Sequence, residues 1–218
     1  MSRPRQFHWK GKRVPFVTPW TGEQTQPGMV VRRIGRGGVQ GIGYADEASH
    51  VDRRYGALWV RRAAVRGLGE PDFDAVHPYR QRQAIAHMLC QVCGASTHDR
   101  PDERHLFLKY TPDGQQITEG ERTARPPVCE PCAVESVGAC PFLRRGYTAA
   151  LVGYARTWGV AGLVHDPVTL VPVDPEGEPT PVELDDPLIR WTLAGATVVT
   201  LHGCTPVNLD DLAAKAAA

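Results

Sequence analysis

The apolar positions of this chain fall mainly into short runs separated by glycine, proline and charged residues. Runs of this kind, bounded by turn-forming residues, predict strands. Met29–Ile34 and Val39–Tyr44 flank Gly35–Gly38, a pattern typical of a β-hairpin. Val14–Val17 is a shorter strand candidate, and Ala57–Arg66 fits either a strand or the start of a helix. The first part of the chain is therefore expected to be rich in strands.

The pattern changes to a helical one over His77–Leu89. Pro78 suits a first helical turn, and Ala84, Ile85 and Met88 recur at helical spacing. This segment predicts an amphipathic helix.

A second hairpin and a short helix are expected after it. His105–Tyr110 reads as a strand, Thr111–Gly114 as a turn and Gln115–Thr118 as the start of the returning strand. A short helix is predicted over Ala133–Val137.

The last part of the chain again predicts strands. The candidates are Ala149–Tyr154, Val160–Val164, Thr169–Val173 and Ile189–Leu201. Between the last two, the proline- and acid-rich segment 174–181 predicts a solvated loop. Leu209–Ala217 predicts a closing helix with Asn208 as its cap.

These elements predict an α+β fold, with β-rich N- and C-terminal parts around a central module. The corresponding segments are 1–76, 77–145 and 146–218, and they could equally form one compact domain. With 218 residues, 42% of them hydrophobic, the chain can bury a substantial core. It lacks the apolar run of a membrane helix, and Met1–Arg13 lacks that of a signal peptide. We therefore expect a cytoplasmic protein of bacterial type with no membrane partner.

The net charge of +1 conceals an uneven distribution. Residues 1–70 carry 13 basic and 5 acidic side chains, whereas residues 166–218 carry 2 basic and 9 acidic ones. The basic part could meet an anionic partner, or it could pack against the acidic part of the same chain.

Three groups of basic residues are candidate contacts to nucleic-acid phosphates. They are Arg32, Arg33 and Arg36 in the first hairpin, Arg53, Arg54, Arg61, Arg62 and Arg66 after it, and Lys10, Lys12 and Arg13 beside Trp9. The alternative for each group is a solvated basic face.

The six cysteines carry the sharpest chemical signal. Cys90 and Cys93 form one C-x2-C pair and Cys129 and Cys132 another, with 35 residues between the pairs. Zn²⁺ prefers four sulfur or nitrogen ligands on a tetrahedron, and a tight turn with this spacing directs two thiolates at one point. Structural disulfides are rare in reducing compartments. The two pairs therefore predict a structural zinc site; buried thiols, an iron–sulfur cluster and a redox role are the alternatives.

The order of knuckle, hairpin and second cysteine pair opening a helix resembles the treble-clef zinc superfamily over about residues 88–140. The resemblance implies a metal-holding fold and does not define an activity. Nuclease members of that superfamily have an Asp/His-His pair on the first strand and usually a histidine after the second cysteine pair. Here His98–Asp99 is reversed and Ala133 follows Cys132, so a nuclease site of that type is not expected.

Four other residues lie near or outside this pattern. Cys140 is interpreted as a core or spare thiol and Cys204 as a buried apolar cysteine. His87 and His98 could replace a thiolate, but four cysteines already complete the ligand set.

These observations favour a zinc-containing binding or regulatory protein with nucleic acid as its partner. One alternative is a small metabolic or tailoring enzyme with a purely structural zinc ion. Its acid and base candidates are His165, Asp166, Glu183, Asp185, Asp186 and His202. A second alternative is a protein–protein interaction module whose basic part binds an acidic surface.

Overall fold

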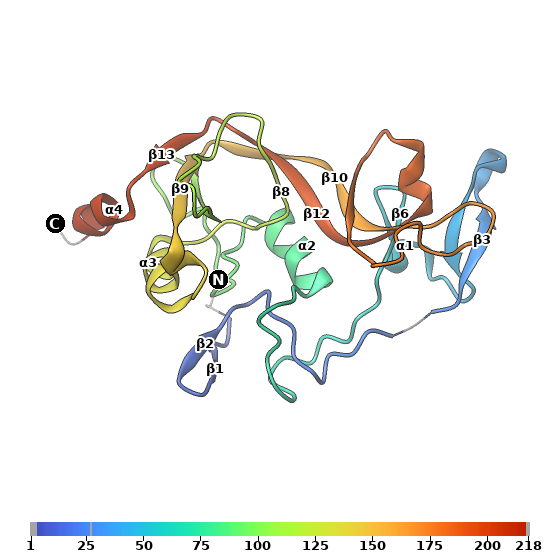
Figure 1. Cartoon of the computed structure of the whole chain (residues 1–218), viewed down its shortest axis with the longest axis horizontal. Helices are drawn as coiled ribbons and strands as arrows, with labels where there is room; N and C mark the ends of the chain where they lie inside the picture. Colours follow the sequence, from blue (N-terminus) through green and yellow to red (C-terminus); the bar gives the residue numbers. More distant parts are fainter. Residues whose placement is uncertain (1–3, 27, 217–218) are drawn as a thin grey trace.

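Two long antiparallel strands, β10 (Tyr154–Val164) and β12 (Thr192–His202), run through the length of the molecule (Figure 1). The computed structural model describes residues 4–26 and 28–216, without the side chains of residues 36, 49, 50 and 213–216. Close strand approach requires glycine on β10, because a Cβ at Gly159 would lie 2.1 Å from the carbonyl oxygen of Val182. The two strands link the end that carries α3 and α4 to the end that carries β3 (Figure 1).

The larger sheet is built on this pair. Its strand order is β11–β10–β12–β6–β5, and β8 also pairs with β12. The bounds of the added strands are β5 (Arg53–Arg54), β6 (Ala57–Trp59), β8 (Arg122–Thr123) and β11 (Thr180–Glu183). The ambiguous segment 57–66 therefore contains a strand, which pairs in parallel with β12.

A smaller sheet has the order β13–β9–β7, with bounds β7 (His105–Tyr110), β9 (Tyr147–Val152) and β13 (Thr205–Val207). β7 pairs along its whole length with β9, so the expected hairpin from β7 to Gln115–Thr118 is wrong. The apolar β9 buries more surface against β7 than the polar segment at Gln115 can. Of that segment, Ile117 is buried in the core.

Two hairpins extend from the sheets. One pairs β1 (Phe7–Trp9) with β2 (Lys12–Val14), and the other pairs β3 (Val30–Ile34) with β4 (Gln40–Tyr44). The second confirms the hairpin predicted around Gly35–Gly38, whose turn contains the short helix η1 (Arg36–Gly38). The strand expected over Val14–Val17 is wrong beyond Val14, where Pro15 follows.

The helices are α1 (Ser49–Asp52), α2 (Pro78–Ala86), α3 (Glu130–Ala139) and α4 (Leu209–Ala216), with short 3₁₀ helices η2 (Leu143–Arg145) and η3 (Pro187–Trp191). α2 confirms the predicted helix but ends before Met88, which has a positive φ of 45°. α4 also confirms its prediction, and the Asn208 side chain accepts a hydrogen bond from the Asp210 amide at 2.9 Å.

The acidic C-terminal part contains the other departures from expectation. The strand predicted over Thr169–Val173 is wrong: the Asp166 carboxylate accepts hydrogen bonds from the amides of Val168 and Thr169 and turns the chain there. The predicted loop over residues 174–181 ends early, because Thr180 and Pro181 open β11.

Strands from all three predicted segments share sheets: β6 pairs with β12, and β7 with β9. One buried ion pair fixes α2 to the N-terminal part, since Arg80 donates to both carboxylate oxygens of Glu23 at 2.6 and 2.7 Å. The molecule is thus an α+β fold dominated by strands, and its division into domains stays a prediction.

Candidate metal centre

The structure brings the sulfur atoms of the four predicted ligand cysteines together at one point. Cys90 and Cys93 lie on a tight turn after α2. Cys129 precedes the first residue of α3, and Cys132 lies in its first turn. Two segments far apart in the sequence therefore converge.

The local turn around Cys90 aims its two thiols in one direction. The Gly94 amide donates to the Cys90 carbonyl at 2.7 Å, and the Cys93 amide donates to the Cys90 sulfur at 3.4 Å. Gly94 has a φ of +73°, and a Cβ there would lie 2.8 Å from the Phe16 ring. Only glycine satisfies both conditions, so the sequence Cys-x-x-Cys-Gly is needed for this turn.

The sulfur positions are compatible with a tetrahedral metal site. All four ligand atoms lie within 4.8 Å of one another, and the Cys93 and Cys129 sulfurs are 3.7 Å apart. A tetrahedron with about 2.3 Å between zinc and sulfur has edges of about 3.8 Å. The residues present therefore fit a four-coordinate metal ion.

The ionisation of the four thiols is strongly coupled. Hydrogen bonds from Cys129 and Cys132 lower the pKa of Cys90 to about 7 and also lower the pKa of Cys93. The pKa values of Cys129 and Cys132 are raised, because their hydrogen bonds to Cys90 and Cys93 and their burial favour the protonated thiols. A cation at the centre would allow all four to ionise together.

Charged side chains from other elements surround the cysteines. Arg13 on β2 donates from Nη1 to the Cys132 sulfur at 3.7 Å, while its Nε lies 3.1 Å from Glu135 on α3. Arg100 pairs with Glu130 in the first turn of α3. Such contacts orient metal ligands and offset their negative charge. Arg13 was expected among the nucleic-acid contacts, and only the folded chain reveals this position.

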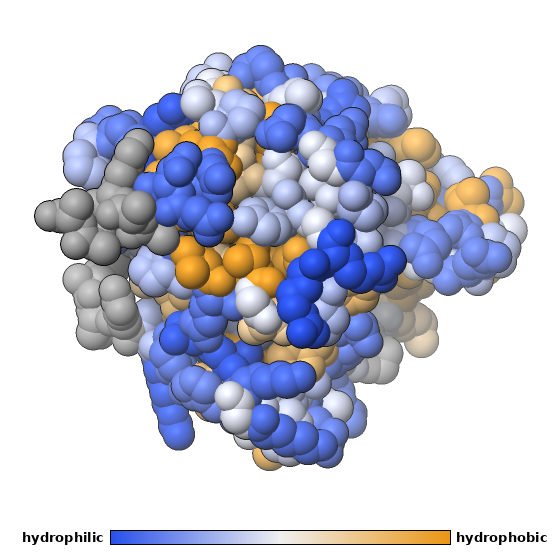
Figure 2. Space-filling view, turned by 60° about the vertical axis from the view of Figure 1, so that its left-hand side comes forward, coloured by the Kyte–Doolittle hydropathy of each residue, from blue (hydrophilic) through white to orange (hydrophobic). Residues whose placement is uncertain are grey.

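The cysteine cluster lies within the apolar core of this end. Cys90, Cys93 and Cys132 are buried and pack with Leu106 of β7 and Leu151 of β9. The surface at this end is largely hydrophilic, with smaller hydrophobic areas between the polar ones (Figure 2). Burial excludes competing water from the ligands and couples the site to the core.

The other candidate ligands lie apart from the cluster. Among the described residues, the group able to hold a metal comprises the four cysteines alone. Cys140 follows the last residue of α3, and Cys204 packs against the central core, where burial raises its pKa. His87 follows α2, and the His98 ring packs edge-on against His105.

Two of the arginines predicted to contact nucleic acid, Arg53 and Arg61, form ion pairs with carboxylates of the same molecule. Arg53 donates to both carboxylate oxygens of Glu47 at 2.9 Å. Arg61 donates to both oxygens of Asp52 at 2.7 and 2.6 Å, and to Asp46 at 2.9 Å. The Arg61 contacts lower the pKa of Asp52.

Backbone carbonyls hold three further arginines. Arg33 donates to Tyr44 at 2.8 Å, Arg62 donates to Glu23 at 2.6 Å, and Arg32 donates to Pro167. These contacts fix the side chains, but their charges have no carboxylate partner in the part of the chain that the structure describes.

The remaining basic residues differ in exposure. Arg54 is exposed, with its guanidinium 5.0 Å from the Tyr55 ring centre. Lys10 and Lys12 are exposed on the β1–β2 hairpin, and Lys10 lies 5.6 Å from the Trp9 ring centre. The side chain of Arg36 lies outside the described residues.

Arg66 is half-buried between the rings of Phe7 and Phe16. Burial and the nearby charge of Arg80 lower its pKa to about 10. It therefore belongs to the packing of the N-terminal part.

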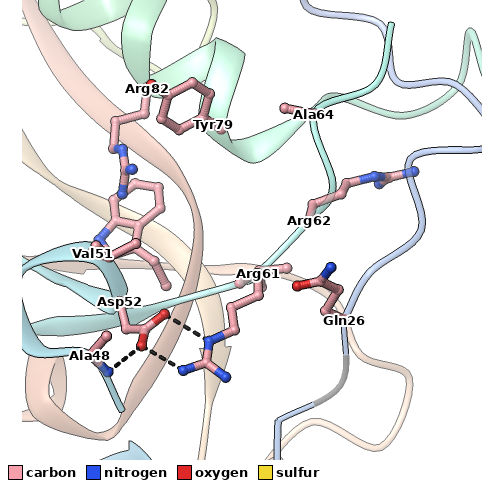
Figure 3. A pocket seen from close by; sticks show the side chains of 11 residues that line it. Gln26, Ala48, Val51, Asp52, Arg61, Arg62, Ala64, Tyr79 and Arg82 are labelled. Carbon is pink, nitrogen blue, oxygen red and sulfur yellow. Dashed lines mark hydrogen bonds and ion pairs between the residues drawn. The ribbon is translucent and has the colours of Figure 1, made fainter. Parts of the chain in front are cut away.

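A cavity at the other end of the molecule was not predicted from the sequence. Three arginines line it, together with the rings of Trp59 and Tyr79 (Figure 3). Arg82 was not among the candidates. Tyr79 and Arg82 are three residues apart on α2, a spacing that places both on one helix face and could have drawn attention to them.

No helix of the described residues is both long and apolar enough to cross a bilayer. Comparison with protein-family models, curated proteins and solved structures found no match for this chain.

Proposed function

We propose that this protein is a zinc-containing binding or regulatory protein in which Cys90, Cys93, Cys129 and Cys132 hold a structural zinc ion. The observation that carries the proposal is the convergence of the four sulfurs within 4.8 Å of one another. Four thiolates on a tetrahedron are a ligand set that zinc prefers.

The ligand set also favours a structural over a catalytic metal. Catalytic zinc sites keep one coordination position for water or substrate, whereas structural sites use four protein ligands. With four cysteine sulfurs, a four-coordinate ion has no position left. The ion would join the turn after α2 to the start of α3 and so stabilise this end of the core.

A treble-clef arrangement of this site is supported by the cysteine turn and by the helix that opens at the second pair. The intervening strand β7 pairs with β9, which follows the helix, so the hairpin typical of that superfamily is replaced here.

Nucleic acid is the partner that we favour, in a cytoplasmic, bacterial setting. The support is the excess of 13 basic over 5 acidic side chains in residues 1–70. Of these, Arg54, Lys10 and Lys12 are exposed, and Trp9 beside Lys10 could stack on a base. Intramolecular contacts hold several other arginines, so the proposed interface is smaller than the charge count suggests.

Elemental analysis of the purified protein tests the metal proposal. We expect one zinc ion per chain, and removal by a strong chelator should lower the melting temperature. A protein without bound transition metal, whose stability a chelator leaves unchanged, would contradict it. Iron in place of zinc would assign the site to a different metal.

Titration with a fluorescent oligonucleotide at several salt concentrations tests the partner. Binding through phosphates should weaken steeply as salt rises. Arg54→Gln should weaken it, whereas Arg66→Lys, which retains the positive charge, should not. The absence of binding at low salt would remove nucleic acid as the partner.

A further inference from the structure

The second feature of interest is a cavity of about 410 Å³ at the end of the molecule away from the cysteines. It opens between α1, the segment after β6 and the start of α2 (Figure 3). Its volume lies in the range of about 300–1,000 Å³ that is typical of small-ligand sites.

One wall of the cavity is a stack of planar groups. The Arg82 guanidinium lies 4.5 Å from the ring centre of Trp59 and 5.6 Å from that of Tyr79. Trp59 is 3% exposed and supports the stack from behind, whereas Tyr79 is 51% exposed. Bases of unpaired nucleotides stack on such aromatic rings and on arginine planes.

The position of α2 fixes this wall. The buried Gln81 side chain accepts a hydrogen bond from the Thr197 amide and donates one to its carbonyl, both at 2.9 Å. These bonds attach α2 to β12. Arg82 is thus presented to the cavity from a rigid support.

The other side of the cavity is lined by Arg61 and Arg62, and the Arg62 side chain extends away from Arg82 (Figure 3). Arg61 is held by its two bonds to Asp52, and its guanidinium lies 4.2 Å from the ring centre of Tyr44. Arg62 uses Nε for the Glu23 carbonyl. Its terminal nitrogens have no carboxylate partner among the described residues.

The charges around the cavity are unbalanced. Three arginines and one carboxylate, Asp52, line it, and Arg61 already neutralises that carboxylate. Arg82 has no hydrogen bond or ion pair with any described residue, and burial together with repulsion from Arg54 lowers its pKa. A bound anion would stabilise Arg82.

We propose that this cavity holds one unpaired nucleotide of a single-stranded nucleic acid, with its base on the exposed Tyr79 ring and a phosphate at Arg82. The inference rests on the proposed function and makes the partner specific. A phosphate alone would leave the aromatic wall unused, and an uncharged ring would leave Arg82 unpaired. A nucleotide satisfies both.

A second arginine–tryptophan pair shows which part of this arrangement matters. Arg122 lies 3.9 Å from the ring centre of Trp158, and like Arg82 it has no hydrogen bond or ion pair with a described residue. It does not line the cavity. An arginine on a tryptophan ring therefore also occurs outside the cavity. Arg122 offers a matched control for Arg82.

The test is fluorescence anisotropy of labelled single-stranded and duplex oligonucleotides with the full-length protein. Tyr79→Ala and Arg82→Gln should each weaken single-strand binding about tenfold. Arg122→Gln should change it less than about twofold, since the loss of one exposed charge acts mainly through the salt-dependent background. Circular dichroism of each variant checks that it is folded.

A second measurement reports on the cavity directly. Binding of a single-stranded oligonucleotide should quench tryptophan fluorescence, and Trp59→Phe should reduce that quenching, with the remainder coming from Trp9. Quenching as strong as in the wild type after this substitution would place the base elsewhere and overturn the inference.

The outcomes separate the two proposals. If the wild-type protein binds nucleic acid but Tyr79→Ala and Arg82→Gln bind equally well, the cavity inference is wrong and the proposed function stands. A preference for duplex over single strands would also overturn it. Failure of the wild-type protein to bind any strand overturns both proposals, and quenching by free nucleoside monophosphates would then assign the cavity to a free nucleotide.

Discussion

The cysteine cluster and the arginine-rich end of the molecule make an instructive comparison. Both appear in the sequence as conspicuous groups of one residue type. In the folded chain the four cysteines of the two pairs meet at one point. The arginines instead spread over several elements, and Arg33, Arg53 and Arg61 bind acceptors of the same molecule.

The difference follows from the chemistry of the two side chains. Cysteine is short and makes few strong hydrogen bonds, so its position is set by the turn or helix that carries it. Arginine is long and has five N–H donors, so it reaches whichever carbonyl or carboxylate lies nearby. A count of arginines therefore overestimates the charge that remains available for a partner.

Loss of a metal ligand should have the largest effect. Cys129→Ser should abolish stoichiometric zinc binding and lower the free energy of unfolding by more than about 4 kcal/mol. Cys140→Ser and Cys204→Ser should retain zinc, because both cysteines lie outside the cluster. Zinc content and denaturant unfolding measure the effect. Equal zinc content in Cys129→Ser and wild type would show that the cysteines do not hold the metal.

The buried arginine contacts can be compared with the exposed ones by mutation. Glu23 is fully buried, and burial would raise its pKa, but the hydrogen bonds from Arg80 and from the Trp20 amide, together with the charge of Arg80, outweigh burial and lower it. Glu23→Ala leaves a buried cation unpaired and should cost about 3–5 kcal/mol. Asp46→Ala breaks an exposed pair with Arg61 and should cost less than about 1 kcal/mol. Urea unfolding measures the stability of both variants. Equal losses of stability would show that the buried and the exposed ion pair contribute alike.

Acid should destabilise the fold through His77. Its side chain is fully buried, its Nε2 lies 3.0 Å from the Ala63 carbonyl, and burial lowers its pKa below the ordinary 6.5. The unfolded chain then binds the proton more readily, so stability is complete above pH 7 and falls as the pH drops below 6.5. The slope from one such group is at most about 1.4 kcal/mol per pH unit.

Unfolding of wild type and His77→Gln between pH 7.5 and about 5 checks this dependence. The variant should show a shallower slope, because glutamine can donate to Ala63 without titrating. Parallel curves for the two proteins would assign the acid sensitivity to other groups, including the thiols.

The smallest effect is expected from Arg13, the cation that contacts the cysteine cluster. Arg13→Gln should weaken zinc binding about tenfold, since outer contacts of this kind tune the affinity of metal ligands. Competition with a chromophoric chelator measures it, and Lys12→Gln, a change at an exposed neighbour, should leave the affinity unchanged. If Arg13→Gln and Lys12→Gln bind zinc with similar affinity, Arg13 does not influence the metal ligands and acts only through its ion pair with Glu135.

Much of the local structure was predictable, because short apolar runs and turn residues act over a few positions. The hairpin at Gly35–Gly38, the helix α2 and the helix α4 formed as expected. Strand pairing was less predictable. β7 found β9 instead of the segment at Gln115, because the choice depends on which strand buries more apolar surface.

The cavity lined by Arg82, like the strand pairing, could not be predicted from local sequence patterns. Its walls come from α1, α2 and the segment after β6, and no local spacing relates Arg62 to Tyr79. The contact of Arg13 with Cys132 likewise joins residues far apart in the chain.

The sequence by itself determined the four ligand candidates and the turn and helix that carry them, since C-x2-C spacing and Gly94 act locally. The tertiary structure decided that the two pairs meet, that Arg53 and Arg61 are paired internally and that Arg82 faces a cavity with no hydrogen-bond or ion-pair partner among the described residues. The physical reason is that convergence and charge pairing depend on distances between remote segments, which are set only when the core packs.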